Sequence, residues 1–158
     1  MKAVLQRVLS ATVKVEGELI GATRNPATGT TLGLLVLLGV QAGDSEAESV
    51  FLARKTAELR IFQDEQGKMN KSIQDVGGSI LVVSQFTLIA DWRKGRRPGF
   101  SRAAPPSEGE RLYLHFVEEL KQLGVPVETG LFGGDMEVSL VNDGPVTIIM
   151  DTKEPTVD

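Results

Sequence analysis

Apolar and polar residues alternate near the start of the chain, over residues 2–8 and 11–20. β-branched residues dominate this pattern, which predicts a first hairpin or one long bent strand, with the turn at residues 16–18. A polar loop that contains Pro and Gly follows at residues 24–31. Residues 32–40 are then continuously apolar, which indicates a strand covered on both faces.

Two later segments carry apolar residues at helical spacing. The first helix is expected from residue 44 or 45 to about residue 60, and Ser45 with Glu48 has the spacing of a capping box. The second follows a Pro-Pro pair, and Ser107 with Glu110 repeats that spacing. The positions expected to be buried are Val50, Ala53, Ala57 and Ile61 in the first helix, and Leu112, Phe116, Leu120 and Leu123 in the second.

Strand patterns return at residues 79–88, 136–141 and 146–150, with a turn expected at the NDGP segment between the last two. The order of elements predicts one compact α/β domain over residues 1–152. Its sheet should be largely antiparallel or mixed and can curl into a barrel, with about two helices. The polar residues 153–158 are expected to form a loose tail.

The chain offers few of the side chains that usually carry catalysis. It has no Cys and one His, so disulfides, thiolate zinc sites and any metal site rich in nitrogen ligands are not expected. His115 lies in the second helix beside its apolar stripe, and we interpret it as structural rather than as part of a triad. No phosphate-binding Gly loop is present, and no cofactor is expected. Catalysis would depend on backbone donors, hydroxyls, water or the substrate itself, which suits an activated bond such as an ester.

The longest apolar run, residues 32–40, is too short to cross a membrane, and no signal peptide is evident at the start. We therefore expect a cytoplasmic protein without membrane partners. The net charge is -4, so any binding to nucleic acid must be local. One local feature qualifies, a basic cluster of Arg93, Lys94, Arg96, Arg97 and Arg102, although a solvated loop is the alternative interpretation.

Two segments are unusually rich in polar or special residues. Residues 84–88 (SQFTL) place three polar side chains at a strand end just before the basic cluster, where they can line a pocket or simply face water. Residues 142–147 (NDGPVT) form a common turn by one interpretation. By the other, the Gly-Pro pair holds an unusual backbone, and its peptide bond can be cis or trans.

Together these stretches resemble the D-aminoacyl-tRNA deacylase family, formerly called D-tyrosyl-tRNA deacylases. The matching stretches are LQRVLSATVKVEGE, GLLVLLGV, RIFQDEQGKMN, GGSILVVSQFTL, RRPGFS and VSLVNDGPVTI. They span nearly the whole chain in the family's order, and SQFTL with NDGP is the most specific pair. The resemblance implies a hydrolase that removes D-amino acids, and glycine, from the 3′-terminal adenosine of tRNA. It also implies binding to the 3′ end and acceptor stem of tRNA, with no DNA expected.

The resemblance further implies roles for individual residues. One wall of the pocket would come from Ser84, Gln85, Phe86 and Thr87, and N–H groups near Phe86 and Thr87 would stabilise the oxyanion. Phe132 and Met136 match positions that help to form the adenosine pocket. Arg93, Lys94, Arg96 and Arg97 are candidates for contacts with tRNA phosphates.

Gly144-Pro145 matches the family's cis Gly-Pro element, which reaches from one subunit into the active site of the other. Its carbonyl oxygens would exclude an L side chain while a D side chain escapes. This implies a symmetric homodimer with shared active sites. Arg7 is a candidate support for the Gly-Pro carbonyls.

Several alternatives stay open at this point. The attacking group is either Thr87 or a water assisted by the ribose 2′-hydroxyl, and we favour water because no base is evident beside Thr87. Rival functions are a non-catalytic nucleic-acid-binding module, a sister deacylase whose Gly-Pro bond is trans and accepts small L-amino acids, and a general esterase. The loop at residues 24–31 is longer than the family's usual hairpin, and would affect substrate preference only if it folds over the pocket.

Overall fold

A computed structural model describes residues 1–155 of the chain. Its helices are α1 (Glu46–Glu58), α2 (Pro106–Gln122) and the short 3-10 helix η1 (Phe86–Ile89). Its strands are β1 (Lys2–Val15), β2 (Glu18–Ala22), β3 (Gly33–Gly39), β4 (Phe62–Gln63), β5 (Met69–Lys71), β6 (Ser79–Ser84), β7 (Val127–Thr129) and β8 (Glu137–Asp151). The expected tail residues 156–158 lie outside the described residues, and no described helix is long and apolar enough to span a membrane.

The main sheet is mixed and runs in the order β2-β1-β3-β6-β7, with β8 added along β1. β3, β6 and β7 are parallel, whereas β1 is antiparallel to β2, β3 and β8. The end strands β2 and β7 meet closely, because a Cβ on Gly21 would lie 2.4 Å from the carbonyl oxygen of Thr129. The sheet therefore curls into a nearly closed barrel, as the sequence predicted.

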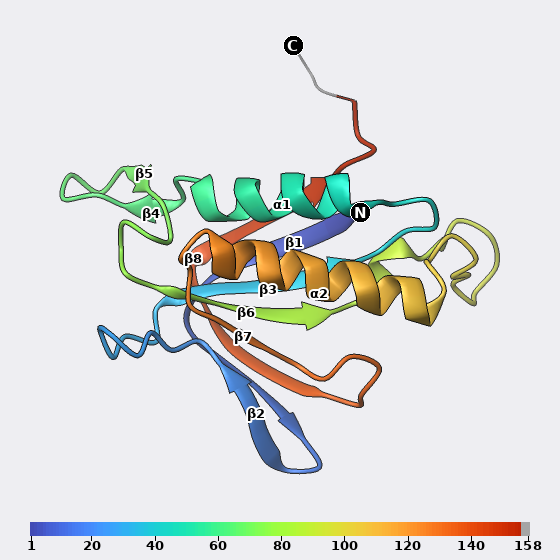
Figure 1. Ribbon diagram of the computed structural model, residues 1–158, viewed down its shortest axis with the longest axis horizontal. Coiled ribbons are helices and arrows are strands. Elements are labelled where there is room, and N and C mark those ends of the chain that lie inside the picture. Colours follow the sequence, from blue (N-terminus) through green and yellow to red (C-terminus); the bar gives the residue numbers. More distant parts are fainter. Residues whose placement is uncertain (156–158) are drawn as a thin grey trace.

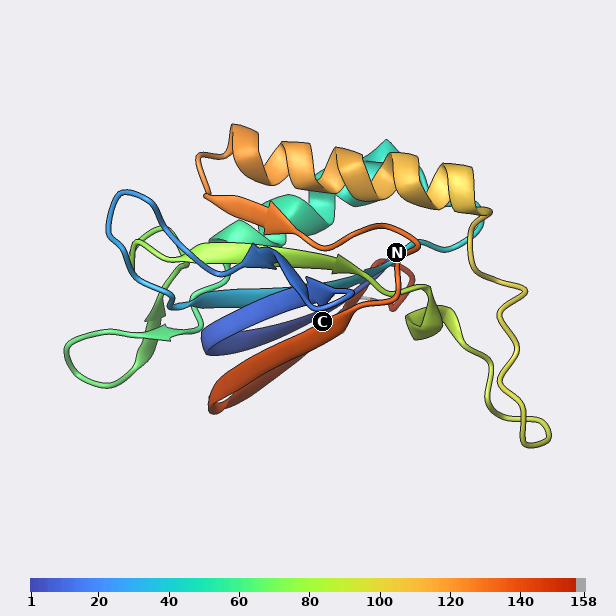
Figure 2. The same cartoon turned by 90° about the horizontal axis from the view of Figure 1, so that it is seen from below.

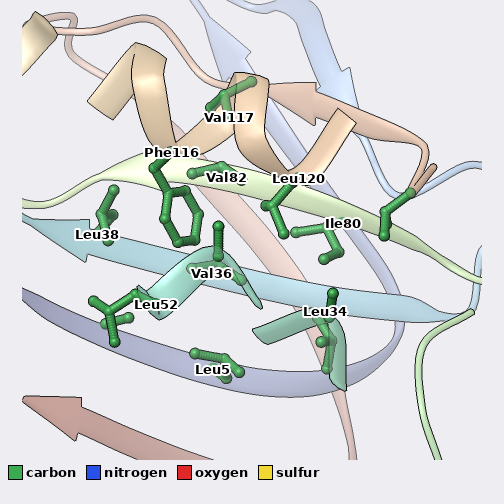
Figure 3. Close-up of a cluster of buried hydrophobic side chains, with 14 of the residues drawn as sticks. Leu5, Leu34, Val36, Leu38, Leu52, Ile80, Val82, Phe116, Val117 and Leu120 are labelled. Atoms are coloured by element: carbon green, nitrogen blue, oxygen red, sulfur yellow. The ribbon is translucent and has the colours of Figure 1, made fainter. Parts of the chain in front are cut away.

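Both helices cover the same face of the sheet (Figures 1 and 2). Figure 3 shows the core between the helices and the sheet, where Phe116 and Leu120 of α2 and Leu52 of α1 meet side chains of β1, β3 and β6. A second, smaller cluster fills the inside of the barrel from the other face of the same strands. β3 is consequently buried on both faces, in agreement with its continuous apolar pattern.

The N-terminal ends of α1 and α2 show which of the predicted capping signals form in the structure. α1 begins at Ser45 with both bonds of the predicted capping box in place. The capping box predicted at Ser107 is wrong: Pro105 is the N-cap and Pro106 the first helical residue. Proline suits this position because its missing N–H has no helical partner there anyway. Leu123, expected to be buried in α2, is 36% exposed because the helix ends before it.

Two strand predictions are also wrong. The strand expected over residues 79–88 ends at Ser84, and the next residues form η1. The two strands expected on either side of NDGP are one strand, β8, which pairs with β1 on both sides of residues 143–146. β1 provides a continuous template on which both halves of β8 find hydrogen-bond partners, so the NDGP segment interrupts the pairing without reversing the chain.

The loop at residues 24–31 packs away from the end of β6 that carries SQFTL. Asn25 donates from Nδ2 to the carbonyl oxygen of Gly77 (2.7 Å), and Thr28 donates to the same oxygen (3.1 Å). Gly77 precedes β6, whereas Ser84 ends it, so the loop covers the opposite end of the sheet. We therefore expect the loop to leave substrate preference unchanged.

Candidate functional site

A cavity of about 370 Å³ opens where β6 ends, between η1, the segment that leads into α2, and the loop after β7. Ser84, Gln85 and Phe86 form one side of it, and Phe132 contributes from the opposite side. Most of the remaining lining is apolar, from residues that include Val40, Phe100, Ala104 and Tyr113. Such a pocket fits a flat apolar group with a few polar atoms, as is usual for small-molecule sites.

The turn from β6 into η1 sets the polar side of this cavity. The N–H of Gln85 donates to the carbonyl oxygen of Leu38 (2.7 Å), which is the last bond between β3 and β6 in this direction. The first bond of η1 then runs from the N–H of Leu88 to the carbonyl oxygen of Gln85 (3.2 Å). The N–H groups of Phe86 and Thr87 precede that bond, so the helix itself provides no acceptor for them.

The side chains of this turn point in different directions. Gln85 donates from Nε2 to Oγ1 of Thr87, which is exposed and lies outside the cavity lining. Phe86 is 59% exposed and meets Phe100 edge to face, with 5.1 Å between the ring centres. Ile89 is buried and anchors η1 to the core. Residues 84–86 therefore belong to the cavity, and Thr87 lies at its edge.

Phe132 and Met136 take different places. Phe132 lines the cavity and packs against Tyr113, with 5.7 Å between the ring centres. Met136 lies outside the lining and packs against the barrel interior, where its sulfur accepts from the N–H of Leu131 (3.3 Å). Met136 thus supports the loop that carries Phe132, and it does not itself line the cavity.

The Gly144–Pro145 peptide bond is cis, and both residues are exposed. In the pairing of β8 with β1, Thr147 faces Gln6 and Asn142 faces Val8, so residues 143–146 all lie opposite Arg7. Gly144 has φ +125, a region that a side chain rarely allows, and a Cβ there would lie 3.1 Å from Nη2 of Arg7. This segment lies outside the cavity lining of its own chain.

Arg7 holds the segment from beneath. Its side chain is 5% exposed, and Nε lies 3.2 Å from both the carbonyl oxygen and a carboxylate oxygen of Asp143. Its Nη1 donates to the carbonyl oxygen of Ile61 (2.7 Å). On the other side, Oδ1 of Asn142 accepts from the N–H of Val146 (3.2 Å). The backbone around Gly144 is therefore fixed at several points.

A family model described as D-Tyr-tRNA(Tyr) deacylase matches residues 4–151. A D-aminoacyl-tRNA deacylase of Ruegeria pomeroyi is 60% identical over 151 residues, which cover 96% of this chain and 99% of that one. One of Geobacter sulfurreducens is 56% identical over 153 residues, covering 97% and 96%.

The chain belongs to the D-Tyr-tRNA(Tyr) deacylase family.

Two solved structures share the fold of this family member. One, titled "c-Myc DNA Unwinding Element Binding Protein", has a TM-score of 0.87 and 42% identity, covering 99% of this chain and 100% of that one. The other, titled as a probable eukaryotic D-amino acid tRNA deacylase, has a TM-score of 0.75 at 17% identity, covering 94% and 97%. The second likeness concerns the fold alone.

The basic cluster of this deacylase-family chain forms an exposed loop directly after η1 (Figure 2). The loop is closed at its base by two hydrogen bonds between the backbones of Asp91 and Gly99, each 2.8 Å long. Nε of Arg93 donates to Oδ1 of Asp91 (3.0 Å), and this hydrogen bond lowers the pKa of the Asp91 carboxyl. Lys94, Arg96 and Arg97 point their charges into solvent.

His115 lies away from the cavity lining, on α2. Its side chain is 26% exposed, and Nε2 is 3.7 Å from a carboxylate oxygen of Glu46 and 3.8 Å from one of Glu119. This position agrees with the structural role expected from the sequence. Within residues 1–155, no group of three His, Cys, Asp or Glu side chains is placed to hold a metal ion.

Sequence reasoning missed two aromatic residues of the cavity, Phe100 and Tyr113. Tyr113 donates from its hydroxyl to the carbonyl oxygen of Val82 (3.0 Å), and burial raises its pKa to about 12. Its position beside the predicted stripe of α2 was the available signal, because a buried Tyr usually has both a packing partner and a hydrogen-bond acceptor. Phe100 follows the basic cluster directly, and no local pattern distinguished it from an ordinary loop residue.

Proposed function

We propose that this protein hydrolyses the ester between a D-amino acid, or glycine, and the 3′-terminal adenosine of tRNA. Membership of the family makes the protein a hydrolase that acts on the aminoacyl-tRNA ester bond. The observation that carries the more detailed proposal is the cavity beside Ser84–Phe86, which combines aromatic walls with backbone N–H groups for which η1 provides no acceptor. The protein would act in the cytoplasm, where aminoacyl-tRNA is used.

The cavity would take the adenosine. Adenine is flat and apolar on its faces, so it would pack between aromatic side chains such as Phe132 and Phe100, with Phe86 at the entrance. The ester would then lie at the start of η1. There the N–H groups of Phe86 and Thr87 would donate to the carbonyl oxygen as it gains negative charge.

The attacking group in this proposal is water, assisted by the ribose 2′-hydroxyl of the substrate. Thr87 is exposed, and its hydroxyl accepts a hydrogen bond from the neutral amide of Gln85, which cannot remove its proton. Such a hydroxyl is a weak nucleophile. Gln85 and Thr87 would instead keep the turn in shape and help to place the water.

Selectivity would come from a second copy of the chain. Gly144 and Pro145 are exposed and lie outside their own chain's cavity, yet Arg7 holds the carbonyl oxygen of Asp143 directly before them. β8 also exposes apolar side chains along the same edge of the sheet, with Ile149 68% and Val141 51% exposed. A symmetric dimer would cover these residues and bring each Gly-Pro element to the partner's pocket. The carbonyl oxygens there would occupy the space of an L side chain.

The basic loop would bind the acceptor stem of the tRNA. Lys94, Arg96 and Arg97 are exposed in the loop whose base adjoins Phe100 of the cavity, so they can neutralise phosphates without reading the base sequence. Replacing Arg96 and Arg97 with Glu should raise KM for charged tRNA and weaken its salt dependence. Unchanged activity at several salt concentrations would show that the loop is only solvated surface.

The decisive experiment follows ester loss from D-Tyr-tRNA, L-Tyr-tRNA and Gly-tRNA. The proposal expects hydrolysis of the D and glycyl esters, with the L ester spared. Equal hydrolysis of D and L esters would reject the chiral filter. No hydrolysis of any ester would favour a binding module, and the relative titled as a DNA-binding protein makes that outcome worth testing.

The dimer is tested separately. Ile149→Glu places a charge on the exposed apolar edge and should produce a monomer in analytical ultracentrifugation. The monomer should lose discrimination against L-Tyr-tRNA, since no partner supplies the Gly-Pro element. As a control, Leu114→Glu changes a residue that is also exposed (53%) but lies on α2, and it should leave both properties unchanged. A monomer that still spares the L ester would contradict shared sites.

A further inference from the structure

The one Trp of the sequence, Trp92, lies in the basic loop and is 76% exposed. It is the most exposed of the large apolar side chains in the described part of the chain. Folding normally removes such a side chain from water, because burying a large apolar group stabilises a protein. Its exposure therefore suggests that a partner covers it.

The loop holds Trp92 outward in a defined way. Its neighbours Asp91 and Arg93 bond to each other through their side chains, and the backbone of Asp91 pairs with that of Gly99. The residues on both sides of Trp92 are therefore fixed, while the indole itself faces solvent. Less conformational entropy is lost on binding when the contact residue is already positioned.

The surroundings of Trp92 are cationic on one side and aromatic on the other. Lys94, Arg96 and Arg97 follow it within five residues and are exposed. At the base of the loop, Phe100 meets Phe86 at the cavity. A ligand that leaves the cavity toward the loop would thus meet an aromatic surface and then positive charge. Single-stranded nucleic acid matches both features, because its bases stack on aromatic side chains and its phosphates bind cations.

We propose that Trp92 stacks on an unpaired base near the 3′ end of the substrate tRNA while the neighbouring cations contact phosphates. This inference rests on the proposed function, because the terminal adenosine in the cavity sets the path of the strand. Trp92 is a positioning residue: it orders the single strand so that the ester reaches the start of η1. Stacking tolerates any base, so this contact adds affinity without selecting a tRNA.

Fluorescence of the single Trp tests the proposal directly. The probe is an uncharged RNA hairpin with an unpaired 3′ tail, compared with the same hairpin made blunt. The tailed hairpin should quench Trp92 emission, and the blunt one should not. Emission that is already blue-shifted in the free dimer and insensitive to the tailed RNA would overturn the proposal, because it would place Trp92 against protein.

Variants separate stacking from charge. Trp92→Ala should weaken binding of a labelled tailed hairpin by about tenfold, whereas Trp92→Phe should keep most of the affinity. Neither should change the slope of affinity against salt, since Trp92 carries no charge, whereas Arg96→Glu should reduce that slope. With D-Tyr-tRNA, Trp92→Ala should raise KM and leave kcat nearly unchanged.

A matched control is Phe51→Ala, which removes another exposed aromatic residue (53%) from α1. It should leave RNA affinity and KM unchanged. If Trp92→Ala behaves like Phe51→Ala while the unaltered protein still hydrolyses D-Tyr-tRNA, stacking is wrong and the proposed function stands. If the unaltered protein hydrolyses no D-aminoacyl ester, the proposed function fails instead.

Discussion

Arg7 joins three parts of the molecule, and replacing it tests whether a rigid Gly-Pro segment sets selectivity. Arg7→Met keeps most of the apolar volume of the side chain and removes the guanidinium. Two backbone carbonyl oxygens, those of Ile61 and Asp143, then lose their donor. The hydrogen bond from Val146 to Asn142 and the packing of Val146 on the core would remain, but the carbonyl oxygens of Gly144 and Pro145 would become freer to move.

The cost can be estimated from these bonds. A hydrogen bond that involves a charged group contributes about 1.5–3 kcal/mol, so the two carbonyl contacts together contribute about 3–6 kcal/mol. The carboxylate of Asp143 adds little, because its side chain is 35% exposed and solvent screens the pair. Arg7→Met also removes the desolvation cost of burying a charged guanidinium, and this gain in stability offsets part of the loss. We therefore expect the free energy of unfolding to fall by roughly 3 kcal/mol.

The assay combines urea unfolding with single-turnover hydrolysis of D-Tyr-tRNA and L-Tyr-tRNA. Arg7→Met should raise the rate for the L ester relative to the D ester by about tenfold or more, which corresponds to about 1.4 kcal/mol of lost discrimination. The control is Leu52→Ala in α1, where Leu52 is 1% exposed and the loss of stability should be of similar size, about 2–5 kcal/mol.

Comparing the D-to-L rate ratios of the two variants separates an effect on selectivity from a general loss of stability. Leu52→Ala should keep the D-to-L ratio of the unaltered protein, because it acts through the apolar core and leaves the hydrogen bonds of Arg7 and Asn142 to residues 143–146 in place. If Arg7→Met loses the expected stability and still keeps that ratio, then a fixed Gly-Pro backbone does not produce the selectivity. The reasoning that connects Arg7 to the chiral filter would then be refuted.

Three further predictions concern the cavity and its walls. Thr87→Ala should retain most of its single-turnover activity on D-Tyr-tRNA, since water attacks; a loss of several orders of magnitude would identify Thr87 as the nucleophile. Gly109→Ala should raise the free energy of unfolding by about 0.5–1 kcal/mol in urea, because alanine is favoured inside a helix. Its new methyl group would lie 3.5 Å from Cζ of Phe132 at the cavity, so KM should also rise; an unchanged KM would place the substrate elsewhere. Burial raises the pKa of Tyr113 to about 12, whereas the unfolded chain ionises near 10, so this stabilising contribution is complete below about pH 10 and is lost by about pH 12. The loss should be roughly 2–3 kcal/mol, and Tyr113→Phe should remove that part of the pH dependence in unfolding measurements.

The sequence by itself determined the local elements. Alternating and continuous apolar patterns predicted β1–β3, and helical spacing predicted α1 and α2, because side-chain periodicity follows directly from backbone geometry. The Ser45–Glu48 capping box formed as predicted, since both partners lie within one turn. The family resemblance was likewise carried by short stretches of sequence in a fixed order.

The tertiary structure alone decided where strands end and which residues meet. β6 stops at Ser84 because its partner β3 offers a last carbonyl oxygen at Leu38, far away in the sequence. β8 continues through NDGP because β1 pairs with both of its halves. The cavity likewise needs Phe100, Tyr113 and Phe132 from three separate segments. Local propensity contains no information about such partners, since their hydrogen bonds and contacts form only when distant parts of the chain pack together.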